Sequence, residues 1–317
     1  MRIIPIELPT PYPVGPVNAY LLPGPPVTLV DCGPKTPEAQ TALEAGFRDA
    51  GFALADVGQL IITHGHIDHF GLAATVAAAS GAAVLAHPLE VPKMTVDPAF
   101  VEPLRSVIGE AGFPPAVGET IIESFRRFRR QIDPIKPTRL LNDGDRVAVA
   151  GGTLEVLHTP GHGQGHICLR SDDVLTSGDL LLEEISPNPV IEFDAQGRRL
   201  HMLPAYLRSL RRVAALAPVI AYPGHGAPIT NPVARVNEIL SHHDARKTRL
   251  AEMLAGRSWT LRELAETWYP NLELFNLFLA LSEVVGHLDL LEEEGRISIE
   301  RRAGVLSYRL LANNSQP

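Results

Sequence analysis

The chain reads Gln59-Leu60-Ile61-Ile62-Thr63-His64-Gly65-His66-Ile67-Asp68-His69-Phe70-Gly71. The apolar residues that open this stretch predict a β-strand, and the end of that strand places His64 and His66 side by side. The loop that follows directs Asp68 and His69 toward a second point nearby. Three imidazoles and one carboxylate within six positions are typical ligands of Zn²⁺ or another borderline first-row cation. A polar helix start with incidental histidines explains one such residue more easily than four, so a metal site is the preferred interpretation.

Three further candidate ligands follow apolar, strand-like runs in the same way. His162 lies in a Thr-Pro-Gly-His turn, Asp179 in a Ser-Gly-Asp turn, and His225 in a Pro-Gly-His-Gly turn. Any one of these residues alone is weak evidence for a metal site. Four strand ends that all carry metal-type ligands are much harder to attribute to chance.

The composition is that of an ordinary globular protein. Of the 317 residues, 45% are apolar and 20% charged, and the net charge is −8. Such a chain has no overall attraction for nucleic acid or anionic membranes. No run of about 18 apolar residues and no long apolar N-terminal stretch occurs, so we expect neither a membrane span nor a signal peptide. The two cysteines, Cys32 and Cys168, cannot form a disulfide framework, and we expect buried thiols in a cytoplasmic protein.

Predicted strands and helices alternate along much of the chain. Apolar runs bounded by Gly and Pro predict strands at 2–8, 17–22, 27–31, 59–62, 82–86, 139–141, 146–149, 153–158, 174–176 and 219–222. Helices are predicted at 37–50, with Thr36 as the N-cap, and at 69–80. This alternation predicts a layered α/β core.

Helical patterns interrupt the alternation at about residues 98–131. Two predicted helices, 99–111 and 117–131, form an insertion that could cover the site and shape a substrate pocket. The second helix carries a run of basic residues: Arg126, Arg127, Arg129 and Arg130. Arginines can bind phosphate or carboxylate. Such a run more often forms a solvated helix face, which is the interpretation that we favour.

Three other polar residues lie near the predicted strand ends. Asp31 could support the metal site, because a ligand imidazole usually needs a partner for its other nitrogen, or it could cap the next turn. Both interpretations of Asp31 remain open. We expect a structural role for His87 and a supporting role, not a ligand role, for His166.

With these motifs in place, the sequence resembles the metallo-β-lactamase superfamily over roughly residues 1–230. The resemblance rests on Thr-His-Gly-His-Ile-Asp-His, Pro-Gly-His, Ser-Gly-Asp and Pro-Gly-His-Gly, in the family's order. It implies a four-layer αββα sandwich with the site at one edge. It also implies two metal ions, the first held by His64, His66 and His162, the second by Asp68, His69 and His225, with Asp179 between them.

The ligand set points to particular branches of that family. Antibiotic-destroying lactamases often have Cys at the position of Asp179, whereas a complete set of seven resembles the glyoxalase II, lactonase and nuclease branches. Relatives commonly have a hydroxyl residue at the position of Cys32, a departure that we interpret as harmless. Zinc is the expected metal, with iron or manganese as alternatives.

The chemistry of such a centre is general. Two divalent ions about 3.5–4 Å apart lower the pKa of a shared water from 15.7 toward about 7 and polarise a carbonyl or phosphoryl oxygen. Asp68 would act as the catalytic residue that orients the bridging hydroxide and collects its proton. The predicted reaction is hydrolysis of a thioester, ester, lactone or phosphodiester, and the fold alone does not choose among them.

The C-terminal part of the chain is predicted to be helical, with a hairpin at its end. Helices are expected at 234–254 and at 272–294. Between them, a capping box formed by Thr260 and Glu263 predicts the start of a short helix. A hairpin follows at 297–299 and 305–310. Three helices and a β-wing resemble the small winged-helix-like domain of one family branch, so we predict a catalytic domain at 1–232 and a winged-helix-like domain at 233–317.

The charge of the last helix argues against nucleic-acid binding. Residues 271–294 contain six acidic residues and no Lys or Arg. A recognition helix of this kind would repel phosphates. We therefore favour a packing role or a homodimer contact for the tail, and we expect His242 and His243 to be solvated.

The sequence thus predicts a dinuclear metal hydrolase that acts on a small ester, a thioester as in glyoxalase II, or a lactone. A single-strand-specific endoribonuclease is the second hypothesis, because of the tail and the arginine run. A non-catalytic protein clamped by metal is the third. Seven ligands argue against the third, because structural zinc sites are typically closed by four.

Overall fold

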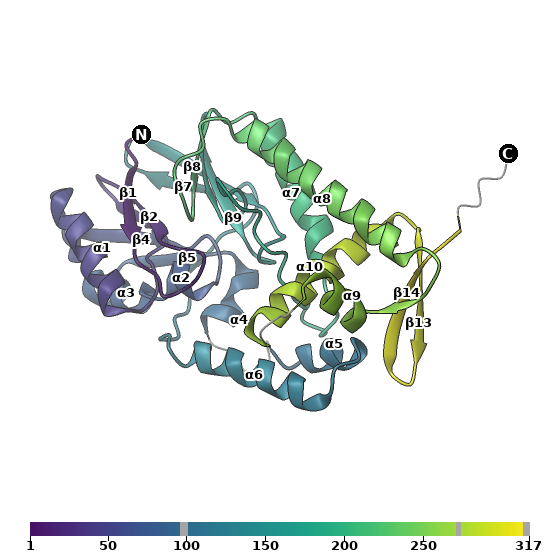
Figure 1. Cartoon of the computed structure of the whole chain (residues 1–317). Helices are drawn as coiled ribbons and strands as arrows, with labels where there is room; N and C mark the ends of the chain where they lie inside the picture. Colours follow the sequence, from purple (N-terminus) through teal and green to yellow (C-terminus); the bar gives the residue numbers. More distant parts are fainter. Residues whose placement is uncertain (96–100, 271–273, 313–317) are drawn as a thin grey trace. The chain divides into compact units, whose positions relative to one another are not determined.

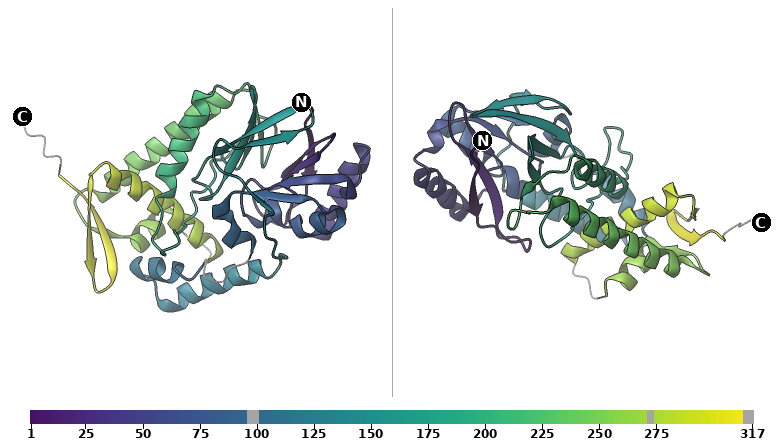
Figure 2. Two further views of the ribbon diagram at one scale, coloured as in Figure 1. Left: turned by 180° about the vertical axis from the view of Figure 1, so that it is seen from behind. Right: turned by 90° about the horizontal axis from the view of Figure 1, so that it is seen from above.

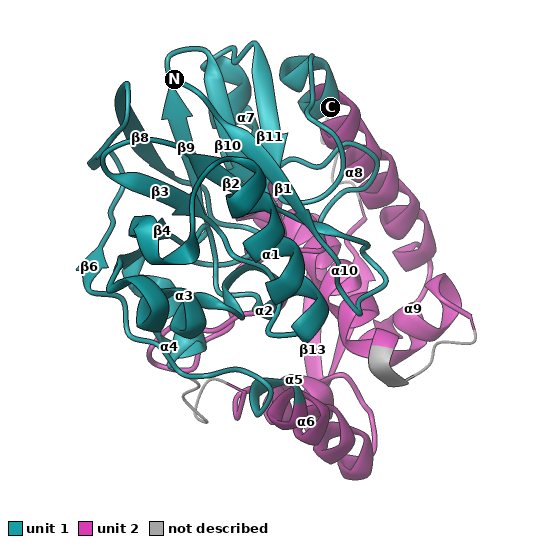
Figure 3. Cartoon of the chain, turned by 90° about the vertical axis from the view of Figure 1, so that its left-hand side faces the viewer, with its two compact units in different colours: residues 1–97, 128–187, 208–236 teal, residues 98–127, 188–207, 237–317 magenta. Residues whose placement is uncertain are grey.

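The computed structural model describes residues 1–95, 101–270 and 274–312. These residues form two compact units, which Figure 3 shows in teal and magenta. Unit 1 comprises 1–97, 128–187 and 208–236, and unit 2 comprises 98–127, 188–207 and 237–317. The helices predicted to begin at 99 and at 272 begin outside the described residues. Among the described residues, no helix combines the length and the apolar character needed to cross a bilayer.

Unit 1 contains two β-sheets (Figure 1). The strands of the first sheet are, in order, β1 (Ile4–Leu8), β2 (Val17–Leu22), β3 (Val27–Val30), β4 (Val57–Ile61), β5 (Ala83–Ala86) and β6 (Arg139–Leu140). The strands of the second are β11 (Ile220–Pro223), β10 (Val174–Gly178), β9 (Ile167–Ser171), β8 (Gly152–His158) and β7 (Arg146–Val149). The first sheet is parallel from β3 to β6, and in the second only β10 and β11 pair in parallel.

Strand β2 shows why the two sheets stack. All six of its residues are buried. Ala19 and Leu21 belong to the core beneath helices α1 (Pro37–Asp49) and α3 (Ala73–Ser80), whereas Tyr20 and Leu22 belong to the core that includes residues of both sheets. A strand covered on both faces is a continuous apolar run instead of an alternating one. The predicted four-layer α/β architecture is confirmed.

Of the two helices predicted within unit 1, the one at 37–50 forms as α1. Thr36 caps α1, accepting a 3.1 Å hydrogen bond from the backbone N of Ala39. The helix predicted at 69–80 is wrong as a single element, because it is divided into α2 (Ile67–Phe70) and α3. The break occurs where the N–H of Leu72 donates to the carbonyl of Gly33 instead of continuing the helix. The sequence pattern did not indicate α4 (Val91–Met94) or α7 (Met202–Ala215).

Unit 2 is mainly helical, with a small sheet. Its elements are α5 (Leu104–Glu110), most of α6 (Pro115–Arg129) and α8 (Pro232–Leu254), α9 (Leu261–Trp268), α10 (Leu274–Glu293), and the strands β12 (Trp259–Thr260), β13 (Ile297–Arg302) and β14 (Val305–Leu310). The predicted capping box is present: Glu263 accepts from the N–H of Thr260, and Thr260 accepts from the N–H of Glu263. Figure 2 shows the β13–β14 hairpin in yellow; it is longer than predicted and turns at Ala303 and Gly304, both with positive φ.

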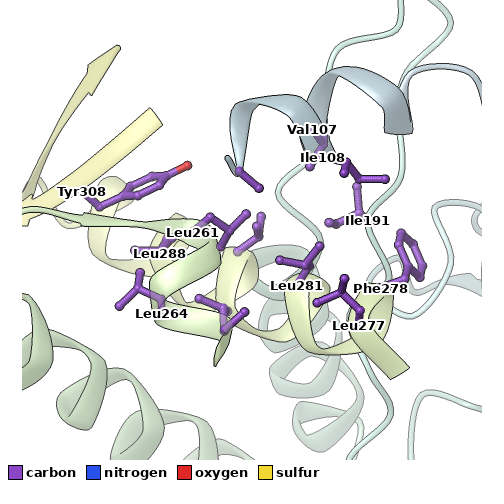
Figure 4. Packing of buried hydrophobic residues seen from close by; sticks show 14 of the residues in the cluster. Val107, Ile108, Ile191, Leu261, Leu264, Leu277, Phe278, Leu281, Leu288 and Tyr308 are labelled. Carbon is purple, nitrogen blue, oxygen red and sulfur yellow. The ribbon is translucent and has the colours of Figure 1, made fainter. Parts of the chain in front are cut away.

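One hydrophobic core holds unit 2 together (Figure 4). It joins Ile108 of α5, Ile191 of the segment 188–207, Leu264 of α9, and Leu281 and Leu288 of α10. The C-terminal helices therefore share their core with two earlier segments of the chain. The sequence pattern did not indicate this association, because each segment shows only that it has an apolar face.

Candidate metal centre

All seven predicted ligands lie in unit 1, at or just after the ends of strands. His64 and His66 follow β4, and His69 lies on the single turn α2. His162 follows β8, Asp179 directly follows β10, and His225 follows β11. The strands end close together partly because backbone hydrogen bonds tie their ends, as between the N–H of Ile167 and the carbonyl of Thr63. The structure thus brings together residues that are up to 161 positions apart in the sequence.

The first group of side chains is His64, His66 and His162. Their potential ligand atoms lie within 4.8 Å of one another. Nε2 of His64 is 3.0 Å from Nδ1 of His66, and the ring centroids of His66 and His162 are 4.4 Å apart. Three imidazoles with converging ring nitrogens can provide three ligands of a tetrahedral cation.

The second group is Asp68, His69 and His225, whose ligand atoms also lie within 4.8 Å of one another. Nε2 of His225 is 3.4 Å from Oδ2 of Asp68, and Nε2 of His69 is 4.0 Å from the same oxygen. This group provides two imidazoles and one carboxylate.

Asp179 lies between the two groups. Its Oδ2 is 3.5 Å from Nε2 of His162 and 3.6 Å from Nε2 of His225, and its Oδ1 is 3.4 Å from Nε2 of His69. One carboxylate therefore faces an imidazole of the first group and both imidazoles of the second. This is the position of a bridging ligand.

The side chains fit a pair of metal ions. Within the described part of the chain, Nε2 of His69, Nε2 of His225 and Oδ1 of Asp179 are buried and form no hydrogen bond. Buried polar atoms without a partner are costly. Distances of 3.4–3.6 Å are longer than ordinary hydrogen bonds. They match the separation of about 3.3 Å between two ligands that share a tetrahedral cation at about 2.0–2.1 Å.

The outer nitrogens of the second group are fixed by hydrogen bonds. Nδ1 of His69 donates to Oδ2 of Asp31 over 2.9 Å, and Nδ1 of His225 donates to the carbonyl of Pro16 over 2.7 Å. Asp31 also accepts from the backbone N–H and the hydroxyl of Thr63. Of the two interpretations left open for Asp31, its geometry matches the one in which it orients an imidazole.

His166 occupies a supporting position rather than joining either group. Its Nε2 accepts a 3.1 Å hydrogen bond from the backbone N–H of Asp179, and its Nδ1 donates to Oγ1 of Thr159 over 2.9 Å. Burial and the neighbouring His162 lower the pKa of His166 to about 3. A neutral His166 therefore fixes the backbone of Asp179.

The protonation states differ between the two groups: those of Asp179 and His64 suit cation binding, whereas nearby carboxylates, against the effect of burial, raise the pKa of His69 and His225. Burial alone would raise the pKa of Asp179, but the imidazoles of His69, His225 and His162 hold it far below its usual range. Burial, followed by the nearby His69 and His66, lowers the pKa of His64. An ionised carboxylate and a neutral imidazole are the forms in which these groups bind metal.

Two further residues, Glu90 and Lys93, are part of this region and were missed by the sequence analysis. Glu90 is fully buried, and its carboxylate accepts from the backbone N–H groups of Gly65 and Gly165 and from Nζ of Lys93. The only sequence signal was an acidic and a basic residue three positions apart, a pattern common on helix surfaces.

Other polar residues singled out by sequence have different surroundings. His87 stacks on His158, with ring centroids 4.2 Å apart. Arg126 pairs with Glu102, and Arg129 donates to the carbonyls of Pro92 and Lys93. Of the four arginines, Arg127 and Arg130 are exposed.

The expectation of a solvated His243 is wrong. His242 is exposed, but His243 is fully buried in unit 2, where its Nδ1 lies 3.3 Å from Nε2 of His287. Glu283 lies close enough to these histidines to complete a possible ligand group. Its carboxylate is instead 3.1 Å from Nε of Arg246, and a buried guanidinium there disfavours a second cation.

Comparison with known proteins agrees with the geometry. The family model of the metallo-beta-lactamase superfamily matches residues 12–225. The chain belongs to the metallo-beta-lactamase superfamily, and it is an enzyme, a hydrolase of that fold.

Two relatives are similar over nearly the whole chain. The probable metallo-hydrolase YqjP of Bacillus subtilis is 34% identical over 308 residues, covering 93% of this chain and 94% of that protein. The crystal structure of the metallo-beta-lactamase family protein TTHA1429 from Thermus thermophilus is 33% identical, with a TM-score of 0.84 and 98% of both chains covered. A shorter match, 28% over 123 residues, is to the atrochrysone carboxyl ACP thioesterase of Aspergillus fumigatus; it covers 38% of this chain and 27% of that protein.

Proposed function

We propose that this chain binds two divalent metal ions through the seven side chains described above and hydrolyses a small thioester or ester, in the manner of glyoxalase II, or a lactone. The observation that carries the proposal is the position of Asp179, whose two oxygens face imidazoles of both groups at 3.4–3.6 Å. Zinc is the metal we propose, because five imidazoles and two carboxylates without a thiolate suit it, with iron or manganese as alternatives.

Different residues of the protein would have different roles in the hydrolysis. When bound, two divalent ions would polarise the scissile carbonyl and lower the pKa of the attacking water. Asp68 would orient that water and take up its proton. Asp31 and the carbonyl of Pro16 hold the imidazoles of His69 and His225 in place, so that little reorganisation accompanies the reaction.

A small acyl substrate is favoured over nucleic acid by charge and by the engagement of the basic residues. The net charge is −8, Arg126 is paired with Glu102, and Arg129 is bonded to two backbone carbonyls. The similarity to a thioesterase is limited to part of the chain, and it supports the thioester class without naming a substrate.

For the C-terminal part we propose a winged-helix-like arrangement with a packing or homodimer role. The order α8, β12, α9, α10 and the β13–β14 hairpin supports it. The acidic residues of α10 disfavour contact with phosphates, and two of them, Glu292 and Glu293, are exposed. We also propose a cytoplasmic location, since Cys32 and Cys168 are buried free thiols. The molar mass in solution tests the dimer.

Metal analysis and a substrate panel test the proposed activity. The purified chain should contain close to two zinc, iron or manganese ions, and it should cleave at least one member of a panel of thioesters, esters and lactones. His66→Ala should reduce kcat/KM by at least about 100-fold, because it removes a ligand of the first group. His242→Ala is the matched control: it changes an exposed histidine of α8 and should behave as the wild type.

The same experiments distinguish the proposal from its alternatives. Activity that survives both a chelator and His66→Ala would contradict the metal-dependent mechanism. Cleavage of single-stranded RNA with no cleavage of small acyl compounds would replace the proposal by the endoribonuclease hypothesis. Two bound metals without activity on any compound class would favour the non-catalytic alternative.

A further inference from the structure

The buried carboxylate of Glu90 connects the two loops that carry the first group of histidines. Its Oε2 accepts from the N–H of Gly65 over 2.7 Å, and its Oε1 accepts from the N–H of Gly165 over 2.7 Å. Gly65 lies between His64 and His66, and Gly165 lies three residues after His162. One side chain thus bonds to the backbone of both loops.

Lys93 makes this carboxylate stable in the interior. Its Nζ lies 2.9 Å from Oε2 and 3.1 Å from Oε1 of Glu90, and both side chains are at least 95% buried. Arg129 in turn donates to the carbonyl of Lys93 at the end of α4. A buried charge needs such pairing and hydrogen bonding. The carboxylate of Glu90 has an ammonium and the backbone N–H groups of the two loops as donors.

Glycines in both loops allow this close approach. A Cβ on Gly65 would lie 2.7 Å from Oε2 of Glu90, and a Cβ on Gly165 would lie 2.9 Å from Oε1. A Cβ on Gly163 would be 3.2 Å from Oε1. Contacts this short leave no room for a side chain, so the glycines beside the histidines bring the backbone against the Glu90–Lys93 pair.

The second group makes none of these contacts with Glu90. His69 lies on α2 and is held by Asp31, whereas His225 follows β11 and is held by Pro16. Asp31 serves both groups, because it also accepts from Thr63, whose hydroxyl lies 3.1 Å from Nδ1 of His64. The backbone hydrogen bonds of Glu90, in contrast, go to the loops of the first group.

We propose that Glu90 is a positioning residue that sets the spacing of His64 and His66 relative to His162, and so controls the metal affinity of the first group without affecting that of the second. This inference rests on the proposed metal centre. A purely structural ion pair would instead support the fold as a whole, and its loss would weaken both groups equally.

Zinc binding to the metal-free protein separates these two roles. In His225→Ala the first group remains complete, and in His66→Ala the second does. Glu90→Gln is added to each of these parents. The amide keeps the size of the side chain but has a single acceptor oxygen for two N–H groups, so one loop loses its bond. Zinc affinity is measured by competition with a chromophoric chelator.

We expect Glu90→Gln to weaken zinc binding about 10- to 100-fold in the His225→Ala parent, the usual cost of losing an outer-shell partner. In the His66→Ala parent we expect a change below about threefold. Asp289→Asn is the matched control, because Asp289 is also a buried carboxylate in an ion pair but lies in unit 2. It should change zinc affinity in neither parent.

A second variant disturbs the same contact but keeps the Glu90–Lys93 ion pair. Gly165→Ala introduces a Cβ 2.9 Å from the Glu90 carboxylate and should give the same selective loss. Equal losses in both parents, or no loss in either, would overturn the role of Glu90 alone. Absence of zinc binding to both parents would instead overturn the proposed metal centre and, with it, this role.

Discussion

At the scale of single residues, Gly224 shows how tightly the centre is packed. A Cβ at this position would lie 2.1 Å from Oδ1 of Asp179 and 2.7 Å from Cε1 of His69. The backbone of Gly224 cannot retreat easily, because its N–H donates to Gly178 and its carbonyl accepts from Asn18. Only hydrogen fits there, so a glycine outside the ligand set determines where two ligands lie.

We therefore predict that Gly224→Ala displaces Asp179 and abolishes retention of two metals. The measurement is the metal content of the purified variant after dialysis, with circular dichroism to check the fold. Gly109→Ala is the control, because a Cβ at this position in α5 meets nothing within 4 Å. It should keep the metals and stabilise the fold by about 0.5–1 kcal/mol. A Gly224→Ala protein with two bound metals would contradict the prediction.

The sequence was sufficient to predict that the seven proposed ligands converge, but not that Glu90 bonds to their loops. The proposed ligands are distant in sequence, but each lies in a short motif at or shortly after the end of an apolar strand, and such an end is recognisable locally. Glu90 binds backbone N–H groups 25 and 75 positions away. A backbone N–H is present at almost every residue, so nothing in the pattern shows which carboxylate will reach which one.

At the scale of elements, the contact between α8 and α10 contains a buried pair of histidines. Nδ1 of His287 donates to the carbonyl of Glu283 over 2.8 Å, which leaves Nε2 to face His243. Burial lowers the pKa of His287 to about 4, with smaller effects of Arg246, His242 and Lys247. Burial and His287 lower the pKa of His243 to about 3.

These shifts predict acid sensitivity of unit 2. Between pH 6.5 and about 4, the unfolded chain binds a proton at His287 that the folded chain does not, so stability is full above pH 6.5 and decreases as the pH falls. We expect the urea midpoint, followed by tryptophan fluorescence, to decrease from pH 7 to pH 5. His287→Asn should remove roughly half of that decrease, because His243 keeps its share.

The exposed His242 provides the control for this prediction. His242→Asn should show nearly the same dependence on pH as the wild type, because the side chain of His242 is exposed. An unchanged decrease in His287→Asn would show that other groups cause the acid sensitivity.

The sequence pattern predicted where helices begin better than it predicted whether a helix is interrupted. The capping box at Thr260 and the N-cap at Thr36 were recognisable because a cap involves residues three positions apart. The division between α2 and α3 was not recognisable, since it depends on a hydrogen bond to Gly33. Patterns within one segment carry no information about a partner in another segment.

At the scale of the whole molecule, each unit has its own hydrophobic interior. The cores of unit 1 lie on the faces of its sheets, and the core of unit 2 lies among its helices. Both tryptophans of the chain, Trp259 and Trp268, belong to unit 2, whereas all seven proposed ligands belong to unit 1. Tryptophan fluorescence therefore reports on one unit and metal binding on the other.

We predict that zinc stabilises the two units unequally. Zinc at 100 times its Kd should add about 2.7 kcal/mol to the unfolding free energy of the unit that binds it. In urea titrations, circular dichroism should show a transition that moves with zinc, while the tryptophan transition moves much less. Transitions that move together with zinc would show that the units unfold cooperatively.

The composition of unit 2 from three separate stretches also limits how such a protein can change during evolution. Its interior takes side chains from residues 98–127, 188–207 and 237–317, so neither end of the gene encodes it alone. A recombination event with its junction between residues 207 and 237 would deliver only the last of the three stretches and leave apolar surfaces uncovered. We expect related genes to gain or lose these stretches together, as one inherited set.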